Sequence, residues 1–345
     1  MNPPSPPRAT LRDIAKSLGI CHATVSLALR NSPQISTARR EQIQEACQRL
    51  GYRPNPMASA LGYQRSQKRF RNIAAEIAWV NFWPDPRQLH VYKEFDSYWK
   101  GATDRAEKLG YRLENFTGKE YSSLNRLEKI LRARNIRGLL IPPHSHWPSE
   151  WKFSCWDEFH VVRFGYSIPY PDVHTVTSDQ FYNSLLAFDK IQERGYRRIG
   201  YVTSAKRRTR FRAGFLLAQA DFPKKDQIPP LVMPTEEQNQ TGQKQLACWL
   251  ARHRPDAVLT DIAMLKQMLE AEGFRVPGDV GLATLSVLDG NATAGIFQDS
   301  ETIGRAAVEI LVTRINSNHE GISASVQETL IHGRWIDGDT LPQIS

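Results

Sequence analysis

Positively charged side chains gather at the N-terminal end of this 345-residue chain. The net charge is +9, and residues 1–71 contain 12 lysines and arginines against three acidic residues, so the rest of the chain is electrically balanced. A charge excess that is confined to one small segment indicates that this segment binds a polyanion, such as a nucleic acid. The alternative is a solvated basic tail.

The charged segment also contains the signals of a small helical domain. Thr10 and Asp13 have the spacing of a helix start, and Gly19 is suited to end that helix in a left-handed conformation. A second helix is expected at 22–29 after a tight turn, and a third at about 37–50. Two short helices that are joined by a glycine turn form a helix-turn-helix unit.

The second helix presents two different faces. Val25, Ala28 and Leu29 can pack inward at helical spacing. The outer face is left with four side chains: His22, Ala23, Ser26 and Leu27.

A short segment beyond the third helix has its own helix-start signals. Asn55 is a good N-cap and Pro56 suits the first helical position, which predicts a helix at 56–61. So short a helix is not stable alone in water. It must therefore be bound by something or pair with a second copy of itself.

Residues 9–61 resemble the headpiece of the lactose repressor (LacI) family. The elements T-L-x-D-I-A, T-V-S, L-G-Y-x-P-N and A-L follow one another in the order and spacing of that family. The resemblance implies that the helix at 22–29 reads double-stranded DNA in the major groove through its outer face. It also implies that a further set of residues approaches phosphates: Thr10, Leu11, Cys21, Arg30, Ser36, Arg39 and Tyr52.

The same resemblance gives the short helix at 56–61 a role as a hinge helix. Paired hinge helices from the two subunits of a homodimer would enter the minor groove, where the leucine wedges open a base step. The matching residues are Asn55, Ala58 and Leu61.

Two positions on the outer face depart from the best-known family members. Leu27 is apolar where they have a long polar or basic residue, and Ala23 is smaller than usual. Leu27 could contact thymine methyl groups, or it could simply cap the small core of the headpiece.

From Asn72 onward strands and helices alternate, which predicts parallel sheets with ligands at the carboxyl ends of the strands. Strands are expected at 73–80, 111–116, 138–143, 159–166, 197–204, 256–261 and 279–287, and helices at 92–110, 123–135, 183–195, 240–254, 263–273 and 302–318. This order resembles the family's core, which is similar to periplasmic sugar-binding proteins and has an effector cleft between two lobes.

The expected fold class is therefore an all-α helix-turn-helix headpiece with a hinge helix, followed by an α/β two-lobed periplasmic-binding-protein-like core with parallel sheets. The expected divisions are a leader at 1–9, the headpiece at 10–61, a linker at 62–71 and the core at 72–345, with an N-lobe at 72–170 plus 299–318 and a C-lobe at 171–298 plus 322–345.

Candidate effector-binding residues follow several of the expected strands. Aromatic faces with polar tips suit sugar-like ligands, although Phe82 and Trp83 could instead pack the lobe surface. The candidates are Asn81, Phe82, Trp83, Asp85, Tyr92, Phe95, Ser204, Arg210, Asp261, Ser286 and Gln298.

Two of the family's polar anchors are altered in this cleft. Many relatives have an arginine where this chain has Phe211, and an aspartate where it has Ser286. The ligand could therefore be a sugar or sugar derivative, another metabolite, or absent. The basic run at 206–212 could bind an anion or nucleic acid, or could be a solvated helix start.

Little in the sequence supports an enzymatic or metal-binding function. Nucleotide-binding, zinc-protease and nucleophile-elbow motifs are missing, so no enzyme, cofactor or metal is expected. His144 and His146 are interpreted as part of a proline-bounded surface loop rather than as metal ligands. The four cysteines are scattered, which favours a reducing compartment. The sequence has no apolar run that could span a bilayer and no secretory signal. We therefore expect a cytoplasmic protein without a membrane partner.

The sequence thus predicts a transcription repressor that binds a pseudo-palindromic operator as a homodimer and responds to a small molecule. A solute-binding protein without DNA function and a transcription activator remain as alternatives. The missing export signal and the complete headpiece argue against the first, whereas repression is preferred over activation on family analogy alone.

Overall fold

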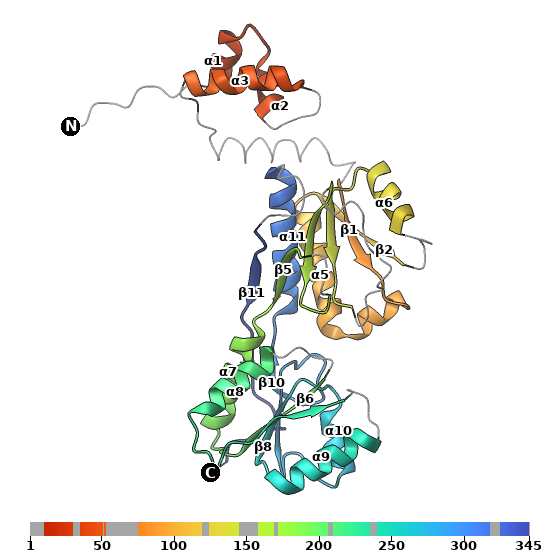
Figure 1. Cartoon of the computed structure of the whole chain (residues 1–345), viewed down its shortest axis with the longest axis vertical. Coiled ribbons are helices and arrows are strands. Elements are labelled where there is room, and N and C mark those ends of the chain that lie inside the picture. Colours follow the sequence, from red (N-terminus) through yellow and green to blue (C-terminus); the bar gives the residue numbers. More distant parts are fainter. Residues whose placement is uncertain are drawn as a thin grey trace, which may run out of the picture. The chain divides into compact units, whose positions relative to one another are not determined.

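The computed structural model describes residues 10–29, 35–50, 52, 75–118, 124–144, 158–168, 172–205, 210–234, 240–317 and 325–344. The chain forms two compact units, a small helical headpiece and a larger α/β core (Figure 1). The leader, the hinge helix and the linker lie outside the described residues. So do four of the predicted DNA contacts: Arg30, Asn55, Ala58 and Leu61.

The described part of the headpiece forms the three predicted helices of the helix-turn-helix domain: α1 (Leu11–Ser17), α2 (His22–Leu29) and α3 (Thr37–Arg49). A capping box begins α1, because Thr10 accepts from the Asp13 amide (3.4 Å) while the Asp13 carboxylate accepts from the Thr10 amide (2.8 Å). Gly19 has a positive φ of 63° in the turn before α2. One small core holds the helices together: Ile14, Ala15, Val25, Ala28, Ile43, Ala46 and Cys47.

The first lobe of the core is built on a six-stranded sheet. Its order is β11-β5-β4-β3-β1-β2, and every neighbouring pair is parallel. The strands are β1 (Ala75–Asn81), β2 (Tyr111–Thr117), β3 (Gly138–Ile141), β4 (His160–Phe164), β5 (His174–Ser178) and β11 (Glu328–Ile331). Its helices are η1 (Pro86–Val91), α5 (Lys93–Lys108), α6 (Leu124–Ala133) and α11 (Ser300–Ser317).

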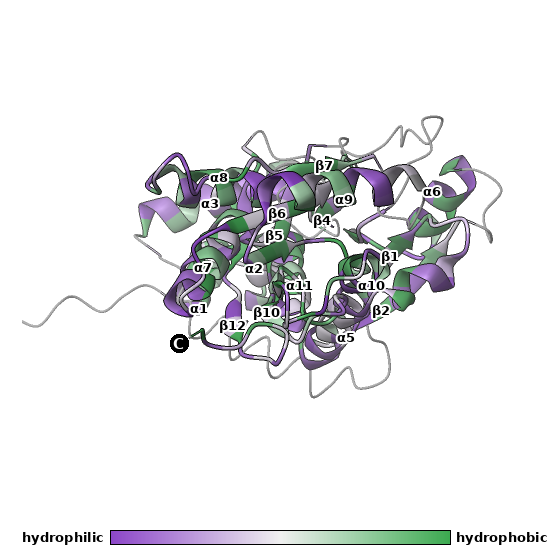
Figure 2. Cartoon of the chain, turned by 90° about the horizontal axis from the view of Figure 1, so that it is seen from below, coloured by the Kyte–Doolittle hydropathy of each residue, from purple (hydrophilic) through white to green (hydrophobic). Residues whose placement is uncertain are grey.

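The second lobe has a six-stranded sheet of order β12-β10-β9-β8-β6-β7, in which only β12 runs antiparallel. Its strands are β6 (Ile199–Ser204), β7 (Leu231–Met233), β8 (Ala257–Thr260), β9 (Gly281–Thr284), β10 (Ala294–Phe297) and β12 (Arg334–Ile336). Its helices are α7 (Gln180–Glu193), α8 (Arg210–Ala220), α9 (Gln240–His253) and α10 (Leu265–Ala271). Strand β7 is hydrophobic, whereas helices such as α6 and α9 carry both kinds of residue (Figure 2).

The chain crosses between the lobes three times, after β5, after β10 and after β11. This corrects the expected lobe boundaries. Residues 174–178 and 328–331, which were assigned to the C-lobe, pair within the sheet of the first lobe. The apolar pattern of a buried parallel strand indicates its burial but not the sheet that it joins.

Two glycines bring α5 and α11 into close contact. A Cβ atom on Gly101 would overlap the carbonyl oxygen of Glu301, and one on Gly304 would overlap the carbonyl oxygen of Tyr98. Since α5 carries several of the residues described below, this close helix contact fixes the position of one wall of the ligand cavity.

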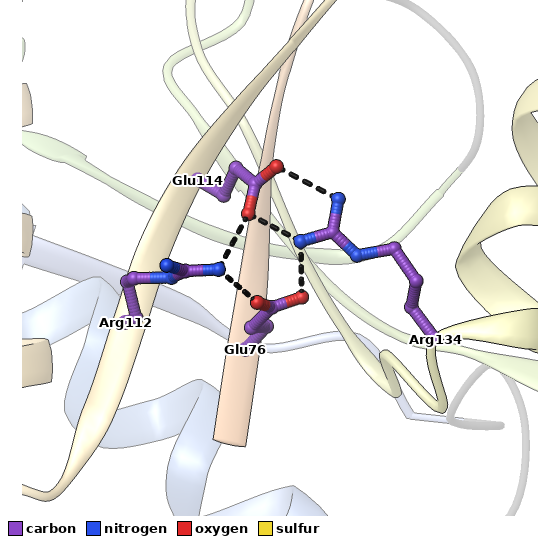
Figure 3. Close-up of polar contacts among 4 residues, drawn as sticks. All are labelled: Glu76, Arg112, Glu114 and Arg134. Carbon is purple, nitrogen blue, oxygen red and sulfur yellow. Dashed lines mark hydrogen bonds and ion pairs between the residues drawn. The ribbon is translucent and has the colours of Figure 1, made fainter. Parts of the chain in front are cut away.

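The starts of β1 and β2 are tied together by four charged side chains (Figure 3). Arg134 donates to Glu76 (2.6 Å) and to Glu114 (2.7 Å), and Arg112 also bonds both carboxylates. The Arg134 hydrogen bonds lower the pKa of Glu114. The exposed fraction of these side chains ranges from 16% for Glu76 to 62% for Arg112, so solvent screens part of their attraction.

Candidate DNA-binding surface and ligand cavity

The outer face of α2 is open, as the sequence predicts. His22 and Ala23 are exposed, and Ser26 and Leu27 are half-buried. Leu27 is not among the hydrophobic residues that pack against the headpiece core. Its position therefore favours an outward contact over the alternative that it caps that core.

The candidate phosphate contacts divide into exposed and packed groups. Cys21, Ser36 and Arg39 are exposed, and Arg39 donates to Gln42 (2.9 Å). By contrast, Leu11 and Tyr52 pack against the headpiece core. Thr10 is also exposed, but its hydroxyl already takes part in the capping box of α1.

A cavity of about 310 Å³ lies between the two lobes of the core. Residues of both lobes line it, including five of the predicted effector contacts: Tyr92, Phe95, Asp261, Ser286 and Gln298. The other lining residues include Glu94, Tyr98, Pro143, Tyr166, Thr177, Ser178, Gln180, Phe211, Thr284 and Asp289.

The segment after β1 does not line this cavity, contrary to expectation. Phe82 and Trp83 are buried in the lobe core. The Phe82 amide donates to His144 Nε2 (2.8 Å) and the Trp83 indole donates to the Pro143 carbonyl (2.8 Å). Asn81 bonds the backbone of this same segment. These aromatic side chains therefore pack the lobe, which is the alternative that the sequence left open.

Three further candidates also lie outside the cavity lining. Asp85 caps η1 by accepting from the Arg87 amide (3.2 Å), and Ser204 is buried at the end of β6. The Arg210 guanidinium stacks on the ring of Tyr166 at 3.5 Å. Arg210 therefore supports a residue of the cavity wall without lining the cavity itself.

Glu94 is the main cavity residue that the sequence analysis missed. Only 4% of it is exposed, and its carboxylate accepts hydrogen bonds from the hydroxyls of Ser286 (Oγ to Oε1, 2.5 Å) and Ser300. Burial raises the pKa of Glu94. Acidic residues are common in the first turn of a helix, because they interact favourably with the helix dipole. The position of Glu94 in the sequence therefore did not distinguish it as a cavity residue.

Asp289 connects the second lobe to the first turn of α5. Its carboxylate accepts from the backbone amides of Lys93 (2.6 Å) and Glu94 (3.4 Å), which are groups that the helix leaves unpaired. The Asp289 amide is held in turn by the Ser286 hydroxyl (3.2 Å). A side chain of one lobe thus caps a helix of the other.

Two other polar residues of the wall are held by protein hydrogen bonds. Asp261 Oδ2 accepts from the hydroxyls of Tyr201 and Thr203, both at 2.9 Å. Gln298 Nε2 donates to the Leu285 carbonyl (2.7 Å). Gln298 itself is 9% exposed, and its carbonyl oxygen accepts no hydrogen bond from the described residues.

His144 is not part of a surface loop, contrary to the prediction, whereas His146 lies outside the described residues. The side chain is buried, and its Nδ1 lies 2.7 Å from the Pro142 carbonyl while its Nε2 accepts from the Phe82 amide. Burial lowers the pKa of His144 to about 4, so the ring is neutral at physiological pH. Within the described residues, no cluster of His, Cys, Asp and Glu is arranged to hold a metal ion.

Profiles of two families match the chain. The profile of bacterial regulatory proteins of the lacI family matches residues 10–55, and that of a periplasmic binding protein-like domain matches residues 188–341. The chain belongs to the lacI family. It is therefore a DNA-binding transcription regulator with an effector-binding domain, and not an enzyme.

Relatives of this LacI-family regulator are similar over nearly their whole length. The HTH-type transcriptional regulator PtxS of Pseudomonas putida is 28% identical over 326 residues, which are 90% of this chain and 91% of that protein. The HTH-type transcriptional regulator KdgR of Bacillus subtilis is 23% identical, covering 90% and 92%.

Solved structures share the fold. A complex of the transcriptional regulator CelR with cellobiose has a TM-score of 0.58 at 21% identity, covering 96% of this chain and all of that one. The lac repressor dimer bound to operator and the anti-inducer ONPF has a TM-score of 0.54 at 16% identity, covering 97% and 100%. The predicted fold class, N-terminal helices followed by two α/β lobes with mostly parallel sheets, is thereby confirmed, whereas the hinge helix lies outside the described residues. No helix in the described part of the chain is long and apolar enough to cross a membrane.

Proposed function

We propose that this LacI-family regulator is a repressor that binds a pseudo-palindromic operator as a homodimer. The observation that carries the proposal is the open outer face of α2, in a helix-turn-helix whose packing leaves His22, Ala23 and Ser26 unused by the headpiece core. A face of this kind reads base edges when the helix lies in the major groove. Two copies related by a two-fold axis would read two inverted half-sites.

The charge distribution supports the DNA-binding role. All the excess positive charge of the chain falls within residues 1–71, which include the headpiece. Lysine and arginine side chains that neutralise phosphates release counterions, so affinity should fall steeply with salt. A protein that regulates genes in this way acts where the chromosome is, which in a bacterium is the cytoplasm.

The cavity between the lobes supports regulation by a small molecule. Hydrogen bonds from Ser286 to Glu94 and from the amide of Lys93 to Asp289 join the two lobes at this cavity. A ligand seated there touches both lobes, so its binding energy depends on how they are arranged, and any effect on operator affinity is reciprocal. The ligand that we propose is a sugar or another small polar metabolite.

The test is selection of bound sequences from random duplex DNA by the purified full-length protein, with and without ligand candidates. An enriched pair of inverted half-sites supports the proposal. Enrichment of a single asymmetric site, or none with any ligand, contradicts it. Repression is separated from activation by fusing the selected site to a reporter promoter and deleting the regulator gene, because loss of a repressor raises expression.

A further inference from the structure

We propose that the ligand of the inter-lobe cavity carries an ammonium group, as an amino sugar or another amine-bearing polar metabolite does. The inference concerns the same cavity and so rests on its proposed role as the ligand site. Three features of the cavity wall carry it: an excess of carboxylates, a buried glutamate with no cationic partner among the described residues, and a row of aromatic faces.

The charge of the wall is one-sided. Glu94, Asp261 and Asp289 line the cavity, whereas no Lys, Arg or His occurs among its described lining residues. The nearby guanidinium of Arg210 is stacked on Tyr166 and pairs with Glu328 at 3.5 Å. A cavity lined in this way repels anions and attracts cations.

Glu94 is the lining residue whose environment most favours a nearby positive charge. Its carboxylate is buried, and its side-chain hydrogen-bond donors within the described residues are two serine hydroxyls, which are neutral. A buried carboxylate without an opposite charge is energetically unfavourable, and burial accordingly raises the pKa of Glu94. Asp261 and Asp289 already accept hydrogen bonds from the protein, so their main effect on a ligand is added negative potential.

Aromatic rings beside Glu94 complete the expected recognition surface. Tyr92, Phe95 and Tyr98 recur at helical spacing, with ring centroids 5.2 Å and 5.9 Å apart, and all three line the cavity. Ammonium groups are attracted to aromatic faces as well as to carboxylates. Beyond them, the Gln298 carbonyl oxygen offers a further acceptor to an N–H or O–H donor.

A neutral polyol would satisfy the acceptors but would leave Glu94 without an opposite charge. A sugar acid or phosphate would face three carboxylates. An amine-bearing ligand fits both the hydrogen-bonding pattern and the charge, since an ammonium supplies three donors and one positive charge.

The test compares ligands that are matched except for charge. Glucosamine, glucose and gluconate form one such triad, and further triads of small amines with their hydroxyl and acid counterparts are added. Binding to the full-length protein is measured by thermal shift and calorimetry at pH 7.5 and low salt. We expect the best amine to bind at least about tenfold more tightly than its hydroxyl counterpart, with the acid weakest. No amine exceeding its counterpart, or an acid binding best, would overturn the proposal.

Matched variants test whether the preference depends on Glu94. Glu94→Gln keeps the size and shape of the side chain while removing its charge and replacing one acceptor oxygen by an NH2 group, and should reduce the preference to below about threefold. Glu301→Gln removes an exposed carboxylate on α11 that pairs with Arg305, and should leave the preference unchanged. An amine preference that survives Glu94→Gln in full would also contradict the proposal.

The same protein preparations show whether a negative result concerns the ligand class or the proposed regulatory function. Operator binding depends on the headpiece and is measured separately by fluorescence anisotropy. A protein that binds its selected operator but shows no amine preference would overturn the ligand class alone. A protein that prefers amines but selects no DNA sequence would overturn the regulatory proposal alone.

Discussion

The Ser286 hydroxyl, which follows β9 in the second lobe, donates a 2.5 Å hydrogen bond to the carboxylate of Glu94 in the first turn of α5 in the first lobe. Because the two residues belong to different lobes, this bond exists only while the lobes are closed on one another. The ligand cavity and the contact that joins the lobes therefore share one carboxylate.

The buried charge of Glu94 should destabilise the ligand-free core at neutral pH. Burial raises the pKa of Glu94 in the folded state above its unfolded value, so folding favours the protonated form and stability declines as pH rises through the raised pKa. Glu94→Gln should therefore have a higher Tm than wild type at pH 7.5 without ligand. The difference should vanish as pH falls below the unfolded carboxyl pKa. A variant less stable than wild type at pH 7.5 would show that the charged form is favoured.

The carboxylate of Asp289 should contribute measurably to core stability. It satisfies two amides at the start of α5, and loss of an N-terminal cap typically costs about 0.5–2 kcal/mol. Asp289→Ala should lower the free energy of unfolding by about 1 kcal/mol in urea titrations. Asp221→Ala, at an exposed aspartate just after α8, serves as the control. Equal stability of the two variants would mean that Asp289 does not cap α5.

Close contact between α5 and α11 should be required for ligand binding as well as for stability. A methyl group at Gly304 would overlap the Tyr98 carbonyl, and overpacking of this kind costs about 1–3 kcal/mol. Gly304→Ala should be destabilised by that amount and should bind cavity ligands more weakly, because α5 carries Glu94 and the aromatic row. Gly278→Ala is the control, since its new methyl group would make only ordinary contacts of 3.4 Å or more. Unchanged unfolding and binding in Gly304→Ala would refute the argument.

Arg39 should contribute to DNA affinity mainly through electrostatics. It is exposed at the first turn of α3. Replacement by alanine should lower affinity for all sequences to a similar degree and reduce the slope of log K against log salt by about 0.9 per lost phosphate contact. Arg252→Ala in α9 removes the same charge from the core and should leave the slope unchanged. If Arg39→Ala instead altered the preference for particular base pairs, Arg39 would be a base-reading residue.

Much of the fold could be predicted because local signals agree with the global structure. The capping residues Thr10 and Asp13, the glycine turn at Gly19 and the inward spacing of Val25 and Ala28 defined the headpiece helices within a residue or two. In the core, the alternation of apolar strand patterns with amphipathic helix patterns predicted the positions of most strands and helices. The short strands β5, β7, β10, β11 and β12 were not predicted, because three to five residues carry little periodic signal.

The cavity was harder to predict because it depends on contacts between distant segments. Glu94 acquires its environment from Ser286 and Ser300, which are 192 and 206 positions away in the chain. Trp83 has the residue type of a ligand contact, yet its indole is bonded to the Pro143 carbonyl 60 positions away. The residue type of Trp83 and its position after a strand predicted that it lies near the cleft. Tertiary packing determines where its side chain points.

The most direct test of the regulator assignment is the affinity and stoichiometry of the full-length protein on its selected operator. Fluorescence anisotropy would compare the intact palindrome with a duplex in which one half-site is scrambled, at several salt concentrations. We predict two chains per duplex, a loss of at least about tenfold on scrambling, and a steep fall in affinity with salt. One chain per duplex with equal affinity for both DNAs would contradict operator recognition by a homodimer.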